Sequence, residues 1–304
     1  MKQHRIRHME IIRKLQSILK TISLYLLITV LTIGSVVNPS YAVEIEYFQN
    51  ILDRGYFKVG IPPYDTPPYY YYDKETKQME GIDIDIVRQF ATNIGVEAVF
   101  DKDSKTYNGL LKRTGAGDFD LTIGKLSTFY KRMQDANPHE YMTFRHALLA
   151  NRRVISKIQG QIPNEKLTPV LTSSNIRIGF IEDSSYGEFA NQLFPNATKL
   201  GLTDWEACKK ALIDKKIDAI YRDATEVKKI VYEEPNLSLD FVPILFDDKL
   251  DHISMYVSSK VNTDLSPMLD YYITKELGIK SDKQIMEEYE CFFNNETLQN
   301  CNKK

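Results

Sequence analysis

Short apolar segments alternate with amphipathic segments along most of the chain, and this alternation restricts the fold more than any other feature. FKVGI (57–61), VEAVF (96–100) and FDLTI (119–123) are short, apolar and bounded by turn residues, which predicts three strands. GIDIDIVRQFATNIG (81–95) places its apolar residues at helical spacing, and a shorter helix is predicted over 107–118. Strands that alternate with helices favour parallel sheets in an α/β fold.

The same alternation begins again near residue 176, which predicts a second block. IRIGFI (176–181) and IDAIY (217–221) are the clearest strands, and Asp223 suits the N-cap of the helix that follows the second of them. The chain then returns to strands and helices that rejoin the first block. The remaining predicted elements are strands at ATKLGL, LDFVPILF and HISMYVSS (252–259) and helices at 184–194, 204–216, 265–278 and 281–290.

The N-terminus has the pattern of a secretory signal peptide. Six basic residues and one acidic residue lie in the first 20 positions, followed by an apolar run, ISLYLLITVLTIGSVV (22–37). Ser40 and Ala42 have the small-x-small spacing of a cleavage site. We predict a cleaved signal over 1–42, with translation starting at Met1 or Met9; an uncleaved anchor is the alternative, although about 20 apolar residues are needed to span a membrane.

The charge of the remaining chain argues against nucleic acid as a partner. The whole chain has 39 basic and 41 acidic residues. Without the predicted signal the balance is 33 to 40, a net charge of −7. Binding to a phosphate backbone requires a basic surface, so the composition favours an exported protein without nucleic-acid partners.

Three cysteines and five histidines offer little chemistry. Cys291 and Cys301 bracket a polar tail, and a disulfide between them is plausible in an oxidising compartment. Cys208 lies on the apolar face of a predicted helix, where a buried free thiol is expected. No spacing of cysteine and histidine predicts a metal site or a cofactor.

Polar and charged residues follow several predicted strands. GKLSTFYKR (124–132) places three cations and two hydroxyls directly after FDLTI. Asp183 to Ser185 follow IRIGFI, and Asp223 follows IDAIY. In parallel sheets, ligands bind beyond the carboxyl ends of strands and near helix N-termini. These segments therefore predict one binding site.

The ordered set of motifs resembles bacterial extracellular solute-binding protein family 3, the periplasmic amino-acid-binding proteins of ABC transporters. The matching pieces of the first block are FKVGI, PPY (67–69), GIDIDI (81–86), TYNGLL and STFYKR (127–132). In the second block, IGFIEDSSYGEFA (178–190) and KIDAIYRDATEV (216–227) resemble the family's strand–helix elements. The similarity extends in order over nearly all of residues 50–290.

The resemblance implies a type II periplasmic-binding-protein fold, in which two lobes with mostly parallel sheets are joined by two hinge crossings. We expect the first lobe over 43–148, the second over 149–250, and a return to the first lobe with the C-terminal helices and tail over 251–304. Such a protein is a periplasmic monomer without a cofactor. It captures a zwitterionic or anionic small molecule, most often an amino acid, for the membrane permease of an ABC importer.

The resemblance also assigns residue roles. Arg132 matches the arginine that holds the ligand carboxylate bidentately, and Ser127 and Ser185 match hydroxyls that contact the same group. Asp223 matches the acid that receives the ligand ammonium, because a buried ammonium must be paired. Tyr107 matches an aromatic residue that packs on the ligand. For Arg132 the alternative is a solvated side chain, and for Ser127 and Asp223 it is a plain N-cap.

Lys125 departs from the family pattern and leaves the ligand open. It stands where binders of basic amino acids carry a small hydroxyl residue, so a Lys or Arg ligand is not favoured. If its side chain points into the cleft, it suits a ligand with extra negative charge; otherwise it lies on the rim. Tyr69, or Tyr64 upstream, is expected to form another wall. Asp183 replaces a glycine found in many relatives.

Two other functions remain open on the same fold. One is an enzyme similar to cyclohexadienyl dehydratases, for which Glu182, Asp183 or Lys125 would have to supply an acid. The other is a ligand-sensing module that signals through a separate membrane protein. Nothing in the sequence supports a catalytic residue, and the leading expectation is a binding protein rather than an enzyme.

Overall fold

The computed structural model describes residues 39–293, except 162, 164 and 259–263. The chain divides into two compact units, Met1–Tyr47 and Phe48–Lys304, and the description below concerns the second. The predicted signal peptide lies mostly outside the described residues, and so does Cys301, so both the signal and the disulfide stay predictions. Within the described ranges, no helix is long and apolar enough to cross a membrane.

The predicted N-terminal elements are present, with most boundaries shifted by one or two residues. The predicted helix over 81–95 is observed over 82–93, and the one over 107–118 is observed over 107–116. The elements are α2 (Pro39–Arg54), β1 (Tyr56–Gly60), β2 (Tyr71–Asp73), β3 (Gln78–Glu80), α3 (Ile82–Asn93), β4 (Glu97–Asp101), α4 (Tyr107–Ala116), β5 (Leu121–Ser127), α5 (Tyr130–Met133) and β6 (Ala136–Asn151). Strand β5 ends four residues later than predicted, and α2, β2, β3 and β6 were not predicted.

The second block also alternates, and helices end the described chain. Its elements are α6 (Arg152–Gln161), α7 (Leu167–Ser173), β7 (Arg177–Ile181), α8 (Ser185–Leu193), β8 (Thr198–Leu202), α9 (Trp205–Ile213), β9 (Ala219–Asp223), α10 (Ala224–Glu233), the 3-10 helix η1 (Pro235–Leu239) and β10 (Phe241–Ser258). They are followed by α11 (Leu265–Tyr272), the π-helix η2 (Ile273–Leu277), β11 (Lys280–Ser281), α12 (Asp282–Glu288) and α13 (Glu290–Phe293).

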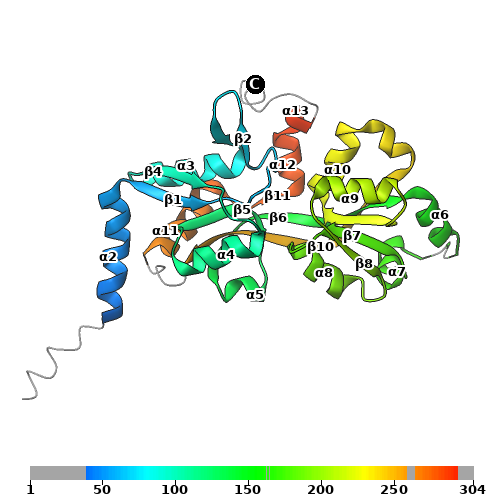
Figure 1. The fold of residues 1–304 in the computed structure, drawn as a ribbon, viewed down its shortest axis with the longest axis horizontal. Helices are drawn as coiled ribbons and strands as arrows, with labels where there is room; N and C mark the ends of the chain where they lie inside the picture. The colour runs from blue at the N-terminus through cyan, green and yellow to red at the C-terminus, as the bar shows by residue number, and fades with distance from the viewer. Residues whose placement is uncertain (1–38, 162, 164, 259–263, 294–304) are drawn as a thin grey trace, which may run out of the picture. The chain divides into compact units, whose positions relative to one another are not determined.

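One mixed sheet runs through the second unit in the order β4-β1-β5-β10-β6-β9-β7-β8, with β11 beside β6 (Figure 1). Strands β4, β1 and β5 are parallel, and so are β9, β7 and β8. We call these two groups, each with the helices between its strands, the first half and the second half. The antiparallel pair β6 and β10 lies between them.

The sequence did not predict β6, and β10 is longer than either of the strands predicted for its residues. The predicted strands LDFVPILF and HISMYVSS are both part of β10, which pairs with β6 from Phe241 to Ser258. The pairing is irregular between Phe246 and Leu250, where the opposite residues are His146 and Arg145. The polar residues that suggested a break in the sequence are therefore a bulge in a continuous strand. The expected lobe boundaries near 148 and 250 fall inside these two strands.

Alternating residues of β6 separate two hydrophobic clusters in the second half. Leu148 packs in one cluster with residues from α7 and α8, while Leu149 packs in the other with residues from α9 and α10. Successive side chains of a strand point to opposite faces, so helices cover both faces of this sheet. A third cluster fills the first half between α4, β5 and β10. Because both faces of this sheet are buried, the end of β7, shortly before Ser185, and the end of β9, at Asp223, are held in place.

Candidate functional site

Strand β5 carries an irregular segment that positions Lys125. Gly124 has a φ of +140°, and a Cβ atom at this position would lie 2.3 Å from Cδ of Pro62. Lys125 follows with a φ of +50°, a region that residues other than glycine seldom adopt. Its backbone N–H donates to Oδ2 of Asp83 at 3.2 Å and to the hydroxyl of Tyr141 at 3.4 Å. The backbone conformation thus directs the Lys125 side chain.

The Lys125 side chain crosses to the second half of the sheet. Its Nζ donates to both carboxylate oxygens of Asp223 at 3.2 Å, to Oε1 of Glu226 at 3.0 Å and to Oγ1 of Thr225 at 3.3 Å. Only 4% of the side chain is exposed. The question that the sequence left open is therefore decided: Lys125 points into the interior between the halves and does not lie on the rim.

Asp223 is the N-cap that the sequence predicted, and its carboxylate also pairs with a side chain of the protein. It caps α10, because Oδ1 accepts from the backbone N–H of Glu226 at 3.1 Å. It also receives an ammonium group, which belongs to Lys125. Burial alone would raise the pKa of Asp223, but Lys125 and Arg222 outweigh it and hold the pKa at about 2. Asp223 is therefore ionised over the neutral range.

Hydroxyl groups from the two halves meet beside this ion pair. Oγ of Ser127, at the end of β5, lies 2.6 Å from Oγ of Ser185, the first residue of α8. Ser127 also donates to Oδ2 of Asp251 at 2.8 Å, and the Tyr186 hydroxyl donates to the same oxygen at 3.1 Å. Phe129, not Ser127, is the N-cap of α5. The plain capping role is thus excluded for Ser127.

Arg132 lies buried next to these hydroxyls. Its Nη1 donates to the backbone carbonyl of Ser127 at 2.8 Å, and the guanidinium stacks over Phe129 at 4.8 Å. Its Nε is buried without a hydrogen-bond partner among the described residues. Burial lowers the pKa of Arg132. Tyr256 and Asp251 raise it, but they offset the effect of burial only in part. A buried guanidinium with an unpaired N–H can take an anionic oxygen.

Asp251 is an acid in this cluster that the sequence did not indicate. The bulge in β10 precedes it, and its Oδ1 is buried without a partner among the described residues. Burial raises the pKa of Asp251 to about 7, while the hydrogen bond from Ser127 lowers it and Asp223 raises it further. The carboxyl group is therefore partly protonated at neutral pH.

Arg222 provides a third buried cation. Its Nε lies 3.5 Å from Oδ2 of Asp223 but makes no hydrogen bond, and its guanidinium stacks against Trp205 at 5.5 Å. Burial lowers the pKa of Arg222, but Tyr107 and Glu226 outweigh it and the net shift is upward. Arg222 therefore stays charged.

These side chains enclose a cavity of about 20 Å³. A cavity of this size holds about one water molecule. The lining residues come from both halves and from β10: Tyr107, Lys125, Arg132, Ser184, Ser185, Tyr186, Arg222, Asp223, Asp251 and Ile253. Five of the seven predicted ligand-binding residues are thus brought together at one place.

The other predicted residues lie near this cavity or away from it. Ser127 contacts it through Ser185, and Tyr69 is buried against Lys125, with its hydroxyl donating to Thr225 at 3.1 Å. Tyr64 is 41% exposed and lies beside Tyr107.

Two acids that the sequence considered lie outside the cavity. Glu182 and Asp183 are exposed and are not among its lining residues. Asp183 has a φ of +57°, in the left-handed region that glycine adopts most readily. Cys208 is buried and free as predicted, and burial raises its pKa to about 12.

Several site residues were not predicted. Arg222, Thr225 and Glu226 flank Asp223 in YRDATE, so the same strand-end reasoning would have included them. The sequence gave no comparable signal for Asp251 and Tyr186. Asp251 is brought to the site by the register of β10, and Tyr186 by the orientation of α8.

Several solved structures that are similar to this chain are described as amino-acid-binding proteins. A substrate-binding protein of an amino-acid ABC transporter from Streptococcus pneumoniae, bound to L-arginine, is 19% identical with a TM-score of 0.63, and 83% of this chain aligns with 98% of that chain. A binding component of an ABC transporter from Wolinella succinogenes, complexed with lysine, is 17% identical with a TM-score of 0.61 over 80% and 94% of the two chains.

A third similar structure is an ancestral amino-acid-binding protein described as a precursor of cyclohexadienyl dehydratase. It is 17% identical with a TM-score of 0.61, and 81% of this chain aligns with 98% of that chain. No curated protein sequence matches the chain. These similarities show that the fold is the type II periplasmic-binding-protein fold that the motifs implied.

The sequence itself gives a narrower match. Residues 57–162 match the family described as bacterial extracellular solute-binding proteins, family 3. This range contains β1, β5 and β6, and with them Lys125, Ser127 and Arg132. The family match is therefore limited to residues 57–162, and the likeness of the whole chain to amino-acid-binding proteins is one of fold.

Proposed function

We propose that the protein captures a small ligand with a carboxylate group, an amino acid or a close analogue, and delivers it to the permease of an ABC importer. One observation carries the proposal: Arg132 is buried at the cavity with an unpaired Nε, beside the paired hydroxyls of Ser127 and Ser185. These groups offer a carboxylate a guanidinium and two hydroxyl donors. The similar proteins from Streptococcus pneumoniae and Wolinella succinogenes hold arginine and lysine.

Ligand entry requires the two halves to separate. The cavity of about 20 Å³ is smaller than any amino acid. Ser127 and Ser185 belong to opposite halves, and their hydroxyls are 2.6 Å apart. A ligand that binds between them must part this contact and then bridge the halves, as in hinged domain closure. Strands β6 and β10, which connect the halves, are the proposed hinge segments.

The proposed location and assembly are supported by the family match of residues 57–162 and by the N-terminal sequence. We propose that the predicted signal over 1–42 exports the protein to the periplasm, and that it acts there as a monomer without a cofactor. Among the described residues, no group of three histidine, cysteine or acidic side chains is arranged to hold a metal ion. Affinity would come from charge pairing and closure, with no covalent step.

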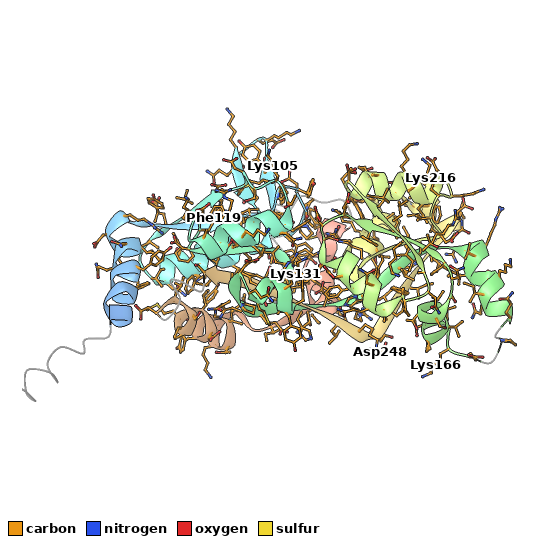
Figure 2. The ribbon with its side chains drawn as sticks, turned by 60° about the horizontal axis from the view of Figure 1, so that its bottom comes forward. Lys105, Phe119, Lys131, Lys166, Lys216 and Asp248 are labelled. Atoms are coloured by element: carbon orange, nitrogen blue, oxygen red, sulfur yellow. The ribbon has the colours of Figure 1, made fainter. Side chains whose placement is uncertain are left out.

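A thermal-shift and calorimetry panel of amino acids and their analogues tests this function, because a ligand that binds only the native state raises the melting temperature. Arg132→Ala should lose about 2–5 kcal/mol of binding free energy, since it removes one partner of a buried charge pair. Lys131→Ala is the matched control, because Lys131 lies on the same segment but is 69% exposed (Figure 2). Equal affinity of Arg132→Ala and wild type would contradict the carboxylate role.

One observation favours a second candidate, an eliminating enzyme of the dehydratase type. Asp251 lines the cavity, its Oδ1 has no partner among the described residues, and its pKa is raised to about 7 by burial, so it can donate a proton near neutral pH. The ancestral protein related to cyclohexadienyl dehydratase has the same fold. Turnover of prephenate or arogenate, abolished in Asp251→Asn, would support the enzyme. A binding protein gives no turnover and a ligand-induced shift.

A further inference from the structure

The subsite for a ligand ammonium is already filled by a side chain of the protein. Nζ of Lys125 has four oxygen atoms within 3.0 to 3.3 Å, from Asp223, Thr225 and Glu226. An ammonium group has only three N–H donors. Lys125 therefore uses the full donor capacity of its own ammonium on the acids that would otherwise receive a ligand's amine.

Aromatic rings complete this subsite. Nζ of Lys125 lies 4.1 Å from the ring centroid of Tyr69 and 4.8 Å from that of Phe144. The two rings meet edge to face at 5.6 Å, and both are fully buried. Rings at such distances attract a cation through their negative faces and are used to recognise ammonium ligands. Acids on one side and rings on another form an ammonium-binding box.

The backbone shows that this placement is built into the fold. Lys125 keeps a left-handed φ of +50° while its N–H is held by Asp83 and Tyr141. A left-handed conformation costs on the order of 1 kcal/mol or more for a residue that is not glycine, and such cost is typically retained at functional positions. The side chain is held from both ends, by its backbone and by its ammonium.

The remaining groups around the cavity favour an anion. The cations Arg132 and Arg222 each have an Nε without a hydrogen-bond partner among the described residues. Asp223 and Glu226 are already paired with Lys125. The unsatisfied polar atoms of the site are thus two guanidinium N–H groups and one oxygen of Asp251. Two donors that lack acceptors require oxygen atoms from the ligand.

We propose that Lys125 replaces the ammonium group of an amino acid, so that the ligand of this protein is a small carboxylic acid without an α-ammonium group. This inference rests on the proposed function, since it names the ligand class of the same site. The acid places its carboxylate on Arg132 and the hydroxyls of Ser127 and Ser185. A free α-ammonium would meet the buried Nζ of Lys125 and be repelled by it.

Matched ligand pairs test the proposal on the wild-type protein. L-aspartate with succinate, L-glutamate with glutarate, and L-alanine with propionate differ only by the ammonium group, so calorimetry with each pair isolates its contribution. The acid of at least one pair should bind about tenfold or more tightly than its amino acid, as expected when a repelling like charge is absent. Tighter binding of the amino acid in every pair that binds would overturn the proposal while leaving the proposed function intact. Binding of no carboxylate at all would overturn both.

Chemical rescue in Lys125→Ala tests the box itself. This variant removes the side chain beyond Cβ, which has the size of propylammonium. Propylammonium should raise the melting temperature of Lys125→Ala and leave wild type and the exposed-site control Lys131→Ala unchanged, and the neutral analogue 1-propanol should have no effect. Lys125→Ala should also bind the amino acids that wild type rejects.

A second variant, Lys125→Met, keeps the test valid if Lys125→Ala fails to fold. Lys125→Met keeps the apolar stem and removes only the charge, so it fills the box between Tyr69 and Phe144. It should lose the preference for the acid over the amino acid by about tenfold. If Lys125→Met keeps the wild-type preference in every pair, Lys125 does not determine the ligand class and the proposal is wrong.

Discussion

Asp251 shows how burial changes the chemistry of one side chain. Its pKa is raised to about 7, and it lies next to Asp223, whose pKa is held at about 2 by Lys125 and Arg222 despite burial. Two carboxyl groups of one site are thus in different protonation states at neutral pH. The difference arises because Lys125 donates to Asp223, while Asp251 receives only hydroxyl donors.

The raised pKa predicts a pH dependence of stability. A carboxyl whose pKa is higher in the native than in the unfolded state binds its proton more tightly when folded, so its contribution is full below about pH 4 and is lost as the pH rises through about 7. Asp251→Asn lacks this contribution. Relative to wild type, its free energy of unfolding should rise by up to about 1.4 kcal/mol per pH unit in that window.

Urea unfolding of both proteins at several pH values measures this difference. Other groups titrate in the same window, such as His146, whose pKa burial lowers to about 4, but they cancel in the comparison. Asp248→Asn is a suitable control, because Asp248 lies in the bulge just before and its side chain is 72% exposed. A pH-independent difference between wild type and Asp251→Asn would contradict the raised pKa.

At the scale of elements, strand β5 positions the first-half side of the site. Its pairing with β10 is irregular between Thr122 and Leu126, and Gly124 and Lys125 both have positive φ values there. A regular strand would also place Lys125 and Ser127 on one face. The irregularity instead accompanies the contacts of the Lys125 backbone N–H with Asp83 and Tyr141.

Gly124→Ala should therefore damage both stability and the site. The new methyl group would lie 2.3 Å from Pro62, and the φ of +140° is unfavourable for alanine. We expect a loss of about 1–3 kcal/mol of unfolding free energy from backbone strain, in addition to the clash. Gly117→Ala separates the two effects, because Gly117 has a φ of +90° and nothing within 4 Å of its Cβ position. Equal losses in both variants would show that contact with Pro62 is unimportant.

At the scale of the whole second unit, the buried ion pairs connect the halves. Lys125 comes from β5, while Asp223 and Glu226 come from the end of β9 and the first turn of α10. Lys229 of α10 also donates to the carbonyl of Pro67 at 3.0 Å. Because both lysines bridge the halves, the proposed closure would form these charge-assisted contacts at the same time.

A double-mutant cycle between Lys125→Met and Glu226→Gln measures this connection. Lys125→Met leaves the buried Glu226 without its cation, whereas Glu226→Gln leaves Lys125 paired with Asp223 alone. The double variant removes both members of the Lys125–Glu226 pair, so the unfolding free energies should differ from additivity by about 0.5–3 kcal/mol. The exposed pair Lys210 and Asp214 is a control, for which the coupling should be only about 0.3–0.5 kcal/mol. Additive effects of Lys125→Met and Glu226→Gln would mean that the halves are not linked through this pair in solution.

The sequence by itself determined the alternation of strands and helices in both blocks, although it did not indicate β6. Local signals, such as apolar spacing and the N-cap at Asp223, depend on neighbouring residues, so they could be read directly. The motifs also indicated Arg132, Ser127 and Ser185 as members of one site. The fold class followed because strands alternating with helices have few ways to bury both faces of a sheet.

Only the tertiary structure decided where Lys125 points and that Asp251 belongs to the site. Both depend on contacts between residues that are about 100 positions or more apart in the chain. Such contacts are set by the register of β5, β6 and β10, including the bulge that the sequence suggested as a break. Register is a property of paired strands and not of either strand alone, and it is register that places the ammonium of Lys125 on Asp223.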